Sequence, residues 1–138
     1  MYASLPPPFS YGTAAMEELF MQIFPSLLGV PEQQQQAMIK QLEPHCDGFH
    51  IDIMDGQFVP AHTSDLSLGH TIQSYTKKPL WIHLMVNDPL QYITQLSLTP
   101  NTIISFHIEA PCNHRDVCKK IRELQCRPSL AITPDTPL

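Results

Sequence analysis

Apolar and polar positions alternate with a period of two in several short stretches of the sequence, most clearly in residues 49–54. These six residues divide into two sets, Phe49, Ile51 and Ile53 against His50, Asp52 and Met54. Because successive side chains of a strand point to opposite sides, one face would be apolar and the other would carry an imidazole and a carboxylate. Together with other short, mainly apolar stretches, this pattern predicts five strands, at residues 20–28, 49–54, 80–86, 102–108 and 128–133.

Stretches with apolar residues at helical spacing separate these strands. We expect helices at residues 31–42, 69–75, 89–96 and 113–125. Strands that alternate with helices imply a parallel sheet covered by helices, so the candidates are a (β/α)₈ barrel and an open α/β sheet. No Gly-x-Gly-x-x-Gly motif follows any strand, and polar residues stand at the strand ends. Both observations favour the barrel.

The length of the chain limits how much of a barrel it can form. A complete (β/α)₈ barrel needs eight strands and about 250 residues, whereas this sequence has 138 residues and five predicted strands. We therefore expect an α/β fold of the TIM-barrel type, truncated after strand five, in residues 20–138. Residues 1–19 are rich in proline and poor in charge, which predicts a poorly ordered N-terminal extension.

Charge and cysteine usage exclude several classes of function. The net charge of -5 argues against binding to nucleic acid or to anionic membranes, which needs clustered lysine and arginine. No apolar run approaches the roughly 20 residues that span a bilayer, and no leader peptide is recognisable. The four cysteines lack Cys-x-x-Cys spacing, so we expect packed thiols and a reducing, cytoplasmic location.

The candidate chemistry lies on the polar face of residues 49–54 and on the next strand. An imidazole and a carboxylate side by side on an inner strand face cost free energy unless they are paired. A hydrogen-bonded pair or a bound divalent cation would satisfy His50 and Asp52. His83 and Met85 repeat the spacing in residues 80–86, which favours the metal. His107 shares a strand end with Glu109, and a role for it in the pocket stays open.

Four motifs make the sequence similar to one known family. They are residues 25–28 (Pro-Ser-Leu-Leu), residues 50–60 beginning His-Ile-Asp-Ile-Met-Asp-Gly, residues 82–86 (Ile-His-Leu-Met-Val) and residues 106–110 (Phe-His-Ile-Glu-Ala). In order and spacing they resemble the ribulose-phosphate 3-epimerase family from about residue 22 to residue 138. The resemblance implies a ribulose-phosphate-binding (β/α)₈ barrel and an isomerase of the pentose phosphate pathway. Such enzymes interconvert D-ribulose 5-phosphate and D-xylulose 5-phosphate by moving the proton on C3.

The resemblance also implies roles for individual residues. His50, Asp52 and His83 would bind one divalent metal ion, which ligand type alone leaves open as zinc, iron, manganese or cobalt. Asp52 would also be one of two acid/base carboxylates, because forming the enediolate requires a group that accepts the C3 proton even when the metal stabilises the resulting charge. Four side chains would contact the sugar-phosphate substrate, namely Ser26, Met54, His83 and Met85.

The sequence departs from the family in ways that leave alternatives open. The family's second acid/base, an aspartate on strand seven, and its phosphate site after strands seven and eight have no counterpart here. Residues 61–68 are about four residues longer than the family's segment, and we interpret His62, Asp65 and His70 as solvated loop residues.

Two alternatives to this epimerase therefore remain. One is a sister epimerase such as one for allulose 6-phosphate. The other is an inactive half-barrel that binds sugar phosphate or self-assembles. An open sheet leaves strand edges unpaired, so we expect a homo-oligomer.

Overall fold

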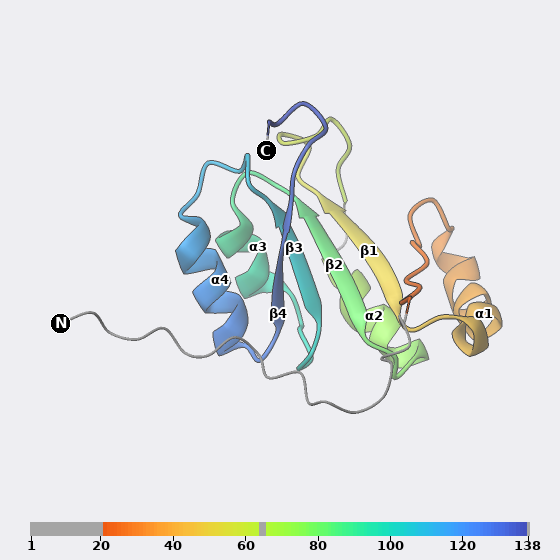
Figure 1. Cartoon of the computed structure of the whole chain (residues 1–138). Coiled ribbons are helices and arrows are strands. Elements are labelled where there is room, and N and C mark those ends of the chain that lie inside the picture. The colour runs from red at the N-terminus through yellow and green to blue at the C-terminus, as the bar shows by residue number, and fades with distance from the viewer. Residues whose placement is uncertain (1–20, 64–65, 138) are drawn as a thin grey trace.

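Four parallel strands in the order β1-β2-β3-β4 form the sheet of this protein, as the computed structural model of residues 21–63 and 66–137 shows (Figure 1). The predicted extension, residues 1–19, lies outside the described residues. The elements in chain order are α1 (Glu32–Leu42), the 3₁₀ turn η1 (Glu43–His45), β1 (Phe49–Met54), α2 (Leu68–Tyr75), β2 (Leu80–Met85), α3 (Pro89–Gln95), β3 (Ile103–His107), α4 (His114–Glu123) and β4 (Arg127–Ala131).

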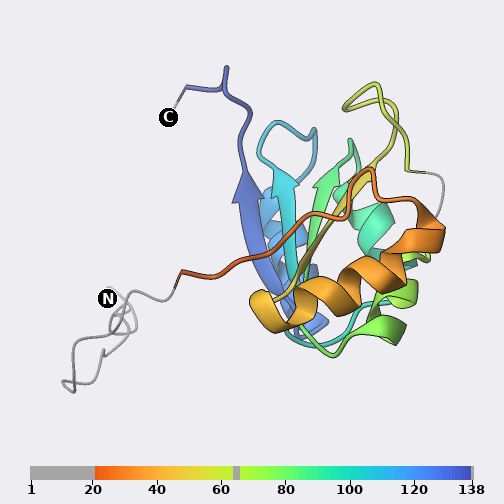
Figure 2. The same ribbon diagram turned by 90° about the vertical axis from the view of Figure 1, so that its right-hand side faces the viewer.

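The helices pack on one face of the sheet. The period-two pattern is confirmed, because alternate residues of β1 and β2 are buried and the residues between them are partly exposed. Phe49, Ile51 and Ile53 belong to the buried core with residues of α1, α2, α3 and α4. Figures 1 and 2 show the opposite face, which carries His50 and Asp52, without a helix over it in the described part of the chain.

Local sequence signals explain where the helices begin. Asp88 caps α3, because its side chain accepts a hydrogen bond from Gln91 N at 3.1 Å, and Pro89 occupies the first helical turn. Asn113 caps α4 in the same manner through Arg115 N. The predicted helices are thus confirmed, although α4 ends at Glu123 and Gln125 adopts a left-handed conformation with φ of 59°.

The first predicted strand, residues 20–28, is wrong in its described part. Residues 21–28 run beside β1, but they make a single parallel bridge between Ser26 and His50. His50 N donates to Pro25 O at 2.9 Å, and Leu27 N donates to His50 O at 3.1 Å. Pro25 has no N–H group with which to continue the ladder toward the start of β1. The described residues therefore form a sheet of four strands where the sequence predicted five.

A parallel sheet with alternating helices is the arrangement of a (β/α)-barrel-type fold, and the described residues form four strands of it. The four cysteines are free thiols, as expected. None of the described helices is both long and apolar enough to cross a membrane.

Candidate metal and acid/base site

Parallel pairing of β1 with β2 brings the polar residues of the two strands together. The register pairs His50 with Trp81, Asp52 with His83, and Met54 with Met85. All six side chains lie on the face that no described helix covers, because each belongs to the partly exposed set of its strand. The predicted site residues of the two motifs are thus neighbours across the sheet.

Asp52 is the centre of this cluster. Its Oδ1 lies 3.3 Å from His83 Nδ1, and its Oδ2 lies 3.3 Å from His50 Nδ1. Ser26 Oγ donates a hydrogen bond to Oδ2 at 3.0 Å, so the bridge between residue 26 and β1 also serves the site. Burial would raise the pKa of Asp52, but His50, His83 and Ser26 outweigh burial and hold that pKa well below its usual range. Asp52 is therefore an ionised carboxylate at neutral pH.

The donor set of His50, Asp52 and His83 fits a divalent cation. One ligand atom from each residue lies within 4.8 Å of the others. His50 Nδ1 is buried and makes no well-directed hydrogen bond to any described residue, which is costly unless another group binds it. Two imidazoles and one ionised carboxylate are common ligands for transition metals. These three residues could hold a metal ion.

Trp81 forms a wall beside the cluster that sequence reasoning missed. Its indole ring lies 5.7 Å from the His50 ring in an edge-to-face arrangement, and its Nε1 donates to Ser105 Oγ at 2.6 Å. Ser105 lies on β3, directly across from His83. Only the register of β2 and β3 brings Trp81 and Ser105 together, so neither motif could have signalled this contact.

A chain of side chains extends from His83 across β3. His83 Nε2 lies 2.9 Å from His107 Nε2, and His107 Nδ1 lies 3.2 Å from Glu109 Oε2. Glu109 Oε1 accepts hydrogen bonds from Thr133 N at 2.7 Å, from Thr133 Oγ1 at 3.1 Å and from the hydroxyl of Thr136. The question left open for His107 is answered in part, because the structure places it against a predicted metal ligand.

The ionisation of this chain of residues follows from its contacts. The hydrogen bonds from Thr136 and Thr133 lower the pKa of Glu109 to about 2. Burial and the neighbouring His83 lower the pKa of His107, while Glu109 acts in the opposite direction. Glu109 is thus an ionised, acceptor-only group next to a histidine that tends to be neutral.

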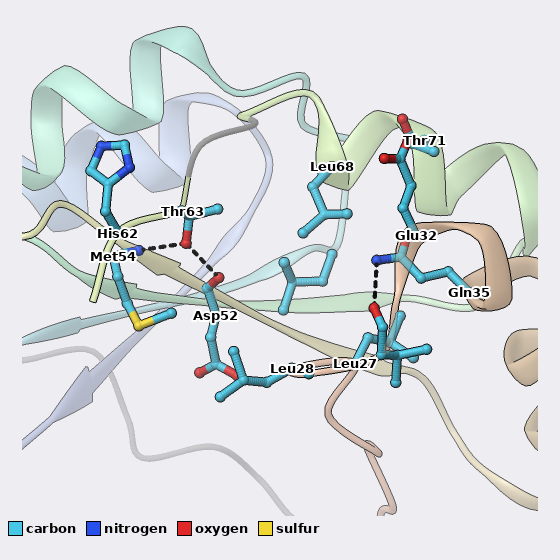
Figure 3. Close-up of a pocket in the computed structure, with 13 residues that line it drawn as sticks. Leu27, Leu28, Glu32, Gln35, Asp52, Met54, His62, Thr63, Leu68 and Thr71 are labelled. Atoms are coloured by element: carbon cyan, nitrogen blue, oxygen red, sulfur yellow. Dashed lines mark hydrogen bonds between the residues drawn. The ribbon is translucent and has the colours of Figure 1, made fainter.

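A cavity of about 280 Å³ adjoins Asp52 at the end of β1. Figure 3 shows Asp52 and Met54 toward one end of it and Glu32 and Gln35 of α1 toward the other. Gln35 is only 6% exposed, and its Oε1 lacks a hydrogen-bond partner among the described residues. Residues of α1 and α2 therefore line this cavity together with Ile51, Asp52 and Met54 of β1.

Asp55 holds two loops at the rim of the site. Its Oδ1 accepts hydrogen bonds from Gln57 N and Phe58 N at 2.8 and 2.7 Å, and its Oδ2 accepts one from Asn87 N at 2.7 Å. Asp55 therefore joins the loop after β1 to the loop after β2, a link that the sequence does not signal. His62 of the longer segment is exposed and bridges back to Asp55 through the backbone.

Comparisons with known proteins agree with this architecture. Residues 22–138 match the ribulose-phosphate 3 epimerase family. The chain is 36% identical over 120 residues to the ribulose-phosphate 3-epimerase of Synechocystis sp., an alignment that covers 84% of this chain and 52% of the relative. It is 32% identical over 120 residues to the Bacillus subtilis enzyme of the same name, with 86% and 55% covered.

A third relative is the cytoplasmic isoform of ribulose-phosphate 3-epimerase from Oryza sativa subsp. japonica. It is 34% identical over 93 residues, which cover 67% of this chain and 41% of the relative. The chain spans about half the length of the curated relatives that it matches. On the extent of the family match, the chain belongs to the ribulose-phosphate 3-epimerase family.

Proposed function

We propose that the protein carrying this chain is a ribulose-phosphate 3-epimerase, an isomerase of the pentose phosphate pathway. It would interconvert D-ribulose 5-phosphate and D-xylulose 5-phosphate through an enediolate formed at C3. The observation that carries this proposal is the approach of His50 and His83, on adjacent parallel strands, to the ionised carboxylate of Asp52. Relatives bearing that name support the choice of substrate.

We infer that His50, Asp52 and His83 hold one divalent ion, which would be zinc, iron, manganese or cobalt. When bound, it would stabilise the negative charge that develops on the substrate oxygens as C3 loses its proton. The buried His50 Nδ1, which lies 3.3 Å from Asp52 Oδ2 but makes no well-directed hydrogen bond to any described residue, supports this inference.

Asp52 would take the C3 proton on one face of the substrate, since its low pKa keeps it ionised and ready to accept a proton. Ser26 would hold the Asp52 carboxylate in place by donating to Oδ2 and would contact the substrate. His83, on the neighbouring strand β2, would also contact the substrate. Met54 and Met85, paired across the sheet, would exclude water without offering a competing proton donor.

Inversion at C3 requires a second carboxylate on the opposite face. Glu109 is unsuited to that task, because His107, Thr133 and Thr136 already occupy its oxygens. We therefore expect residues 1–138 alone not to invert C3, since one carboxylate cannot both remove and deliver a proton on opposite faces. We also propose a cytoplasmic location, because the four cysteines of this chain are free thiols.

Proton exchange tests this proposal. The native gene product that carries this sequence would be incubated with ribulose 5-phosphate in heavy water and each of the four metals in turn. We expect deuterium to enter C3 in the parent and not in Asp52→Asn, whereas Asp116→Asn on the exposed start of α4 would leave exchange unchanged. Absence of exchange with every metal would reject the activity. Allulose 6-phosphate as a second substrate would reveal the sister specificity.

A second candidate function is an inactive half-barrel that binds sugar phosphate or self-assembles. It is favoured by the uncovered sheet face and by β4, which pairs with β3 alone among the described strands. Leu130 on β4 is 53% exposed. A homo-oligomer would cover such surfaces. Light scattering together with equilibrium binding of ribulose 5-phosphate would distinguish this function from catalysis.

A further inference from the structure

We propose that the cavity beside α1 binds a primary ammonium group carried on a short hydrocarbon chain, with Gln35 and Glu32 as the residues that recognise it. The cavity has a volume of about 280 Å³. Its lining includes Asp52 but neither His50 nor His83, so the cavity adjoins the metal cluster without being part of it. The inference therefore goes beyond the proposed function and does not depend on a bound metal.

The buried side-chain oxygen of Gln35 carries the argument. Gln35 lines the cavity and is 6% exposed. Its Nε2 donates to Val30 O at 3.4 Å, and a backbone carbonyl can only accept, so the amide nitrogen must face Val30. This contact fixes the orientation of the amide, and it makes Oε1 an acceptor without a hydrogen-bond partner among the described residues. Such a buried acceptor costs free energy, and a ligand that donates a hydrogen bond to it would offset that cost.

The charges around the cavity favour a cation as this donor. Glu32 precedes Gln35 by one turn of α1, so the two side chains share a face of the helix, and both line the cavity (Figure 3). Asp52 is a second acidic residue of the lining, which contains no lysine or arginine. The dipole at the start of α1 opposes a cation, but it is equivalent to roughly half a unit charge, less than one carboxylate. An anionic ligand would be repelled.

The remaining walls favour a hydrocarbon chain attached to that cation. Leu27, Val30, Ile51 and Leu68 line the cavity, and two of them, Leu27 and Ile51, belong to the buried core. Apolar walls attract a ligand that removes its own apolar surface from water. An ammonium group has three donors and no acceptor, which suits a cavity whose unpartnered groups accept. A short aliphatic amine combines both properties.

The test is an NMR titration of the full 138-residue chain with n-butylammonium chloride, in the presence of a chelator that keeps metal ions away from the amine. The methyl groups of Leu27 and Leu68 line the cavity and report its occupancy. Ile121 of α4 is the remote control, because it lies outside the lining. We expect saturable shifts at Leu27 and Leu68 with a roughly millimolar dissociation constant, as is usual for so small a ligand.

Two molecules of similar size test the chemical class of the ligand on the parent chain alone. The neutral n-butanol donates one hydrogen bond, and butyrate is an anion that only accepts. We expect both to bind at least about tenfold more weakly than n-butylammonium. Equal binding of either molecule would overturn the assignment to amines. This comparison holds even if a variant of Gln35 fails to fold.

Variants of α1 test the two recognition residues. Gln35→Leu removes the acceptor at similar size and should weaken n-butylammonium binding about tenfold. Gln33→Leu, the same change at an exposed position of α1, should leave binding unchanged. Glu32→Gln should weaken binding about two- to fivefold, and the loss should shrink as salt is added, because Glu32 is exposed. Glu123→Gln on the exposed surface of α4 is its control.

The outcomes separate this inference from the proposed function. Saturable shifts at Leu27 and Leu68 that are weakened by Gln35→Leu and not by Gln33→Leu would support the amine site. Three results would reject it: no saturable shift, shifts confined to the imidazoles of the metal cluster, or equal affinity in the parent and a folded Gln35→Leu. Because a chelator is present throughout, each of these results leaves the proposed metal site and isomerase activity to their own tests.

Discussion

Asp52 on β1 and His83 on β2 are register partners in the parallel sheet, and Oδ1 of the first lies 3.3 Å from Nδ1 of the second. This relationship depends on the pairing of two strands whose sequences lie about thirty residues apart. A slip of one residue would move one side chain to the helix-covered face. The buried alternates Ile51 and Ile82, which are also register partners, prevent such a slip by occupying the core.

The first prediction concerns the ligands. Asp52→Asn and His83→Ala should each lower Zn²⁺ affinity by at least about 100-fold, because a lost ligand costs more than a lost supporting group. The single tryptophan of the chain, Trp81, has its ring 5.7 Å from that of His50, so its fluorescence should report binding. Asp116→Asn is the control. Undiminished binding by Asp52→Asn would place the ion elsewhere.

The second prediction concerns the loop anchor Asp55. Asp55→Asn should lower the free energy of unfolding by roughly 1–2 kcal/mol near neutral pH, because its new amino group faces either Asn87 N or the N–H groups of residues 57 and 58. Urea unfolding of the parent and the variant would measure the difference.

The lowered pKa of Asp55 also predicts how the stability of the parent, compared with that of Asp55→Asn, depends on pH. Burial raises the pKa of Asp55, but the N–H groups of Asn87, Phe58 and Gln57 outweigh it, so the pKa in the folded chain is lowered. A lowered pKa contributes stability that is complete above the ordinary value of about 3.9 and is lost as the pH falls through the folded-state value. The difference in the free energy of unfolding between the parent and Asp55→Asn should therefore become smaller in acid. A difference that grows in acid would contradict the stabilising role of the ionised Asp55 carboxylate.

The part of the fold that the sequence predicted is the part encoded locally. Strict alternation in residues 49–54 specified which side chains would reach the site, and Asp88 with Pro89 specified the start of α3. The first strand was overpredicted because an apolar stretch looks strand-like even where Pro25 removes the donor that a ladder requires. The composition of residues 20–28 indicated an extended segment, but the missing N–H group of Pro25 limited its pairing with β1.

The supporting residues could not be predicted, because their contacts cross the sheet. Glu109 reaches Thr133 over 24 positions, and Trp81 reaches Ser105 over the same separation. Neither Thr133 nor Ser105 has a local sequence pattern that would indicate its partner across the sheet. The predicted metal ligands could be recognised because histidine and aspartate are common ligands. The role of Thr133 could not, because it depends entirely on which residue lies next to it in the fold.

The third prediction concerns Gly48, the residue before β1. A β-carbon there would collide with the Pro79 carbonyl oxygen and the Phe24 ring, and the backbone oxygen cannot move without disturbing β2. Gly48→Ala should lower the free energy of unfolding by at least about 2 kcal/mol. Gly69→Ala is the matched control, since its β-carbon would meet Ile82 Cδ1 at an ordinary 3.8 Å. Because residue 69 lies in helix α2, Gly69→Ala should be neutral or should raise the free energy of unfolding by up to about 1 kcal/mol. Equal effects would contradict the steric argument.

The fourth prediction concerns the free edge of the sheet. On the side away from β3, β4 has no strand partner among the described residues, and its Leu130 is 53% exposed. An apolar edge with unpaired backbone groups tends to pair with a second copy of the chain, and a lysine on such an edge opposes pairing. Leu130→Lys should therefore lower the mass of the 138-residue chain in multi-angle light scattering from an oligomer toward a monomer. Gln95→Lys adds the same charge on exposed α3 and should leave the mass unchanged. A parent chain that is monomeric at every concentration tested would contradict this prediction. Self-association would then not be the way in which the exposed edge and face of the sheet are covered.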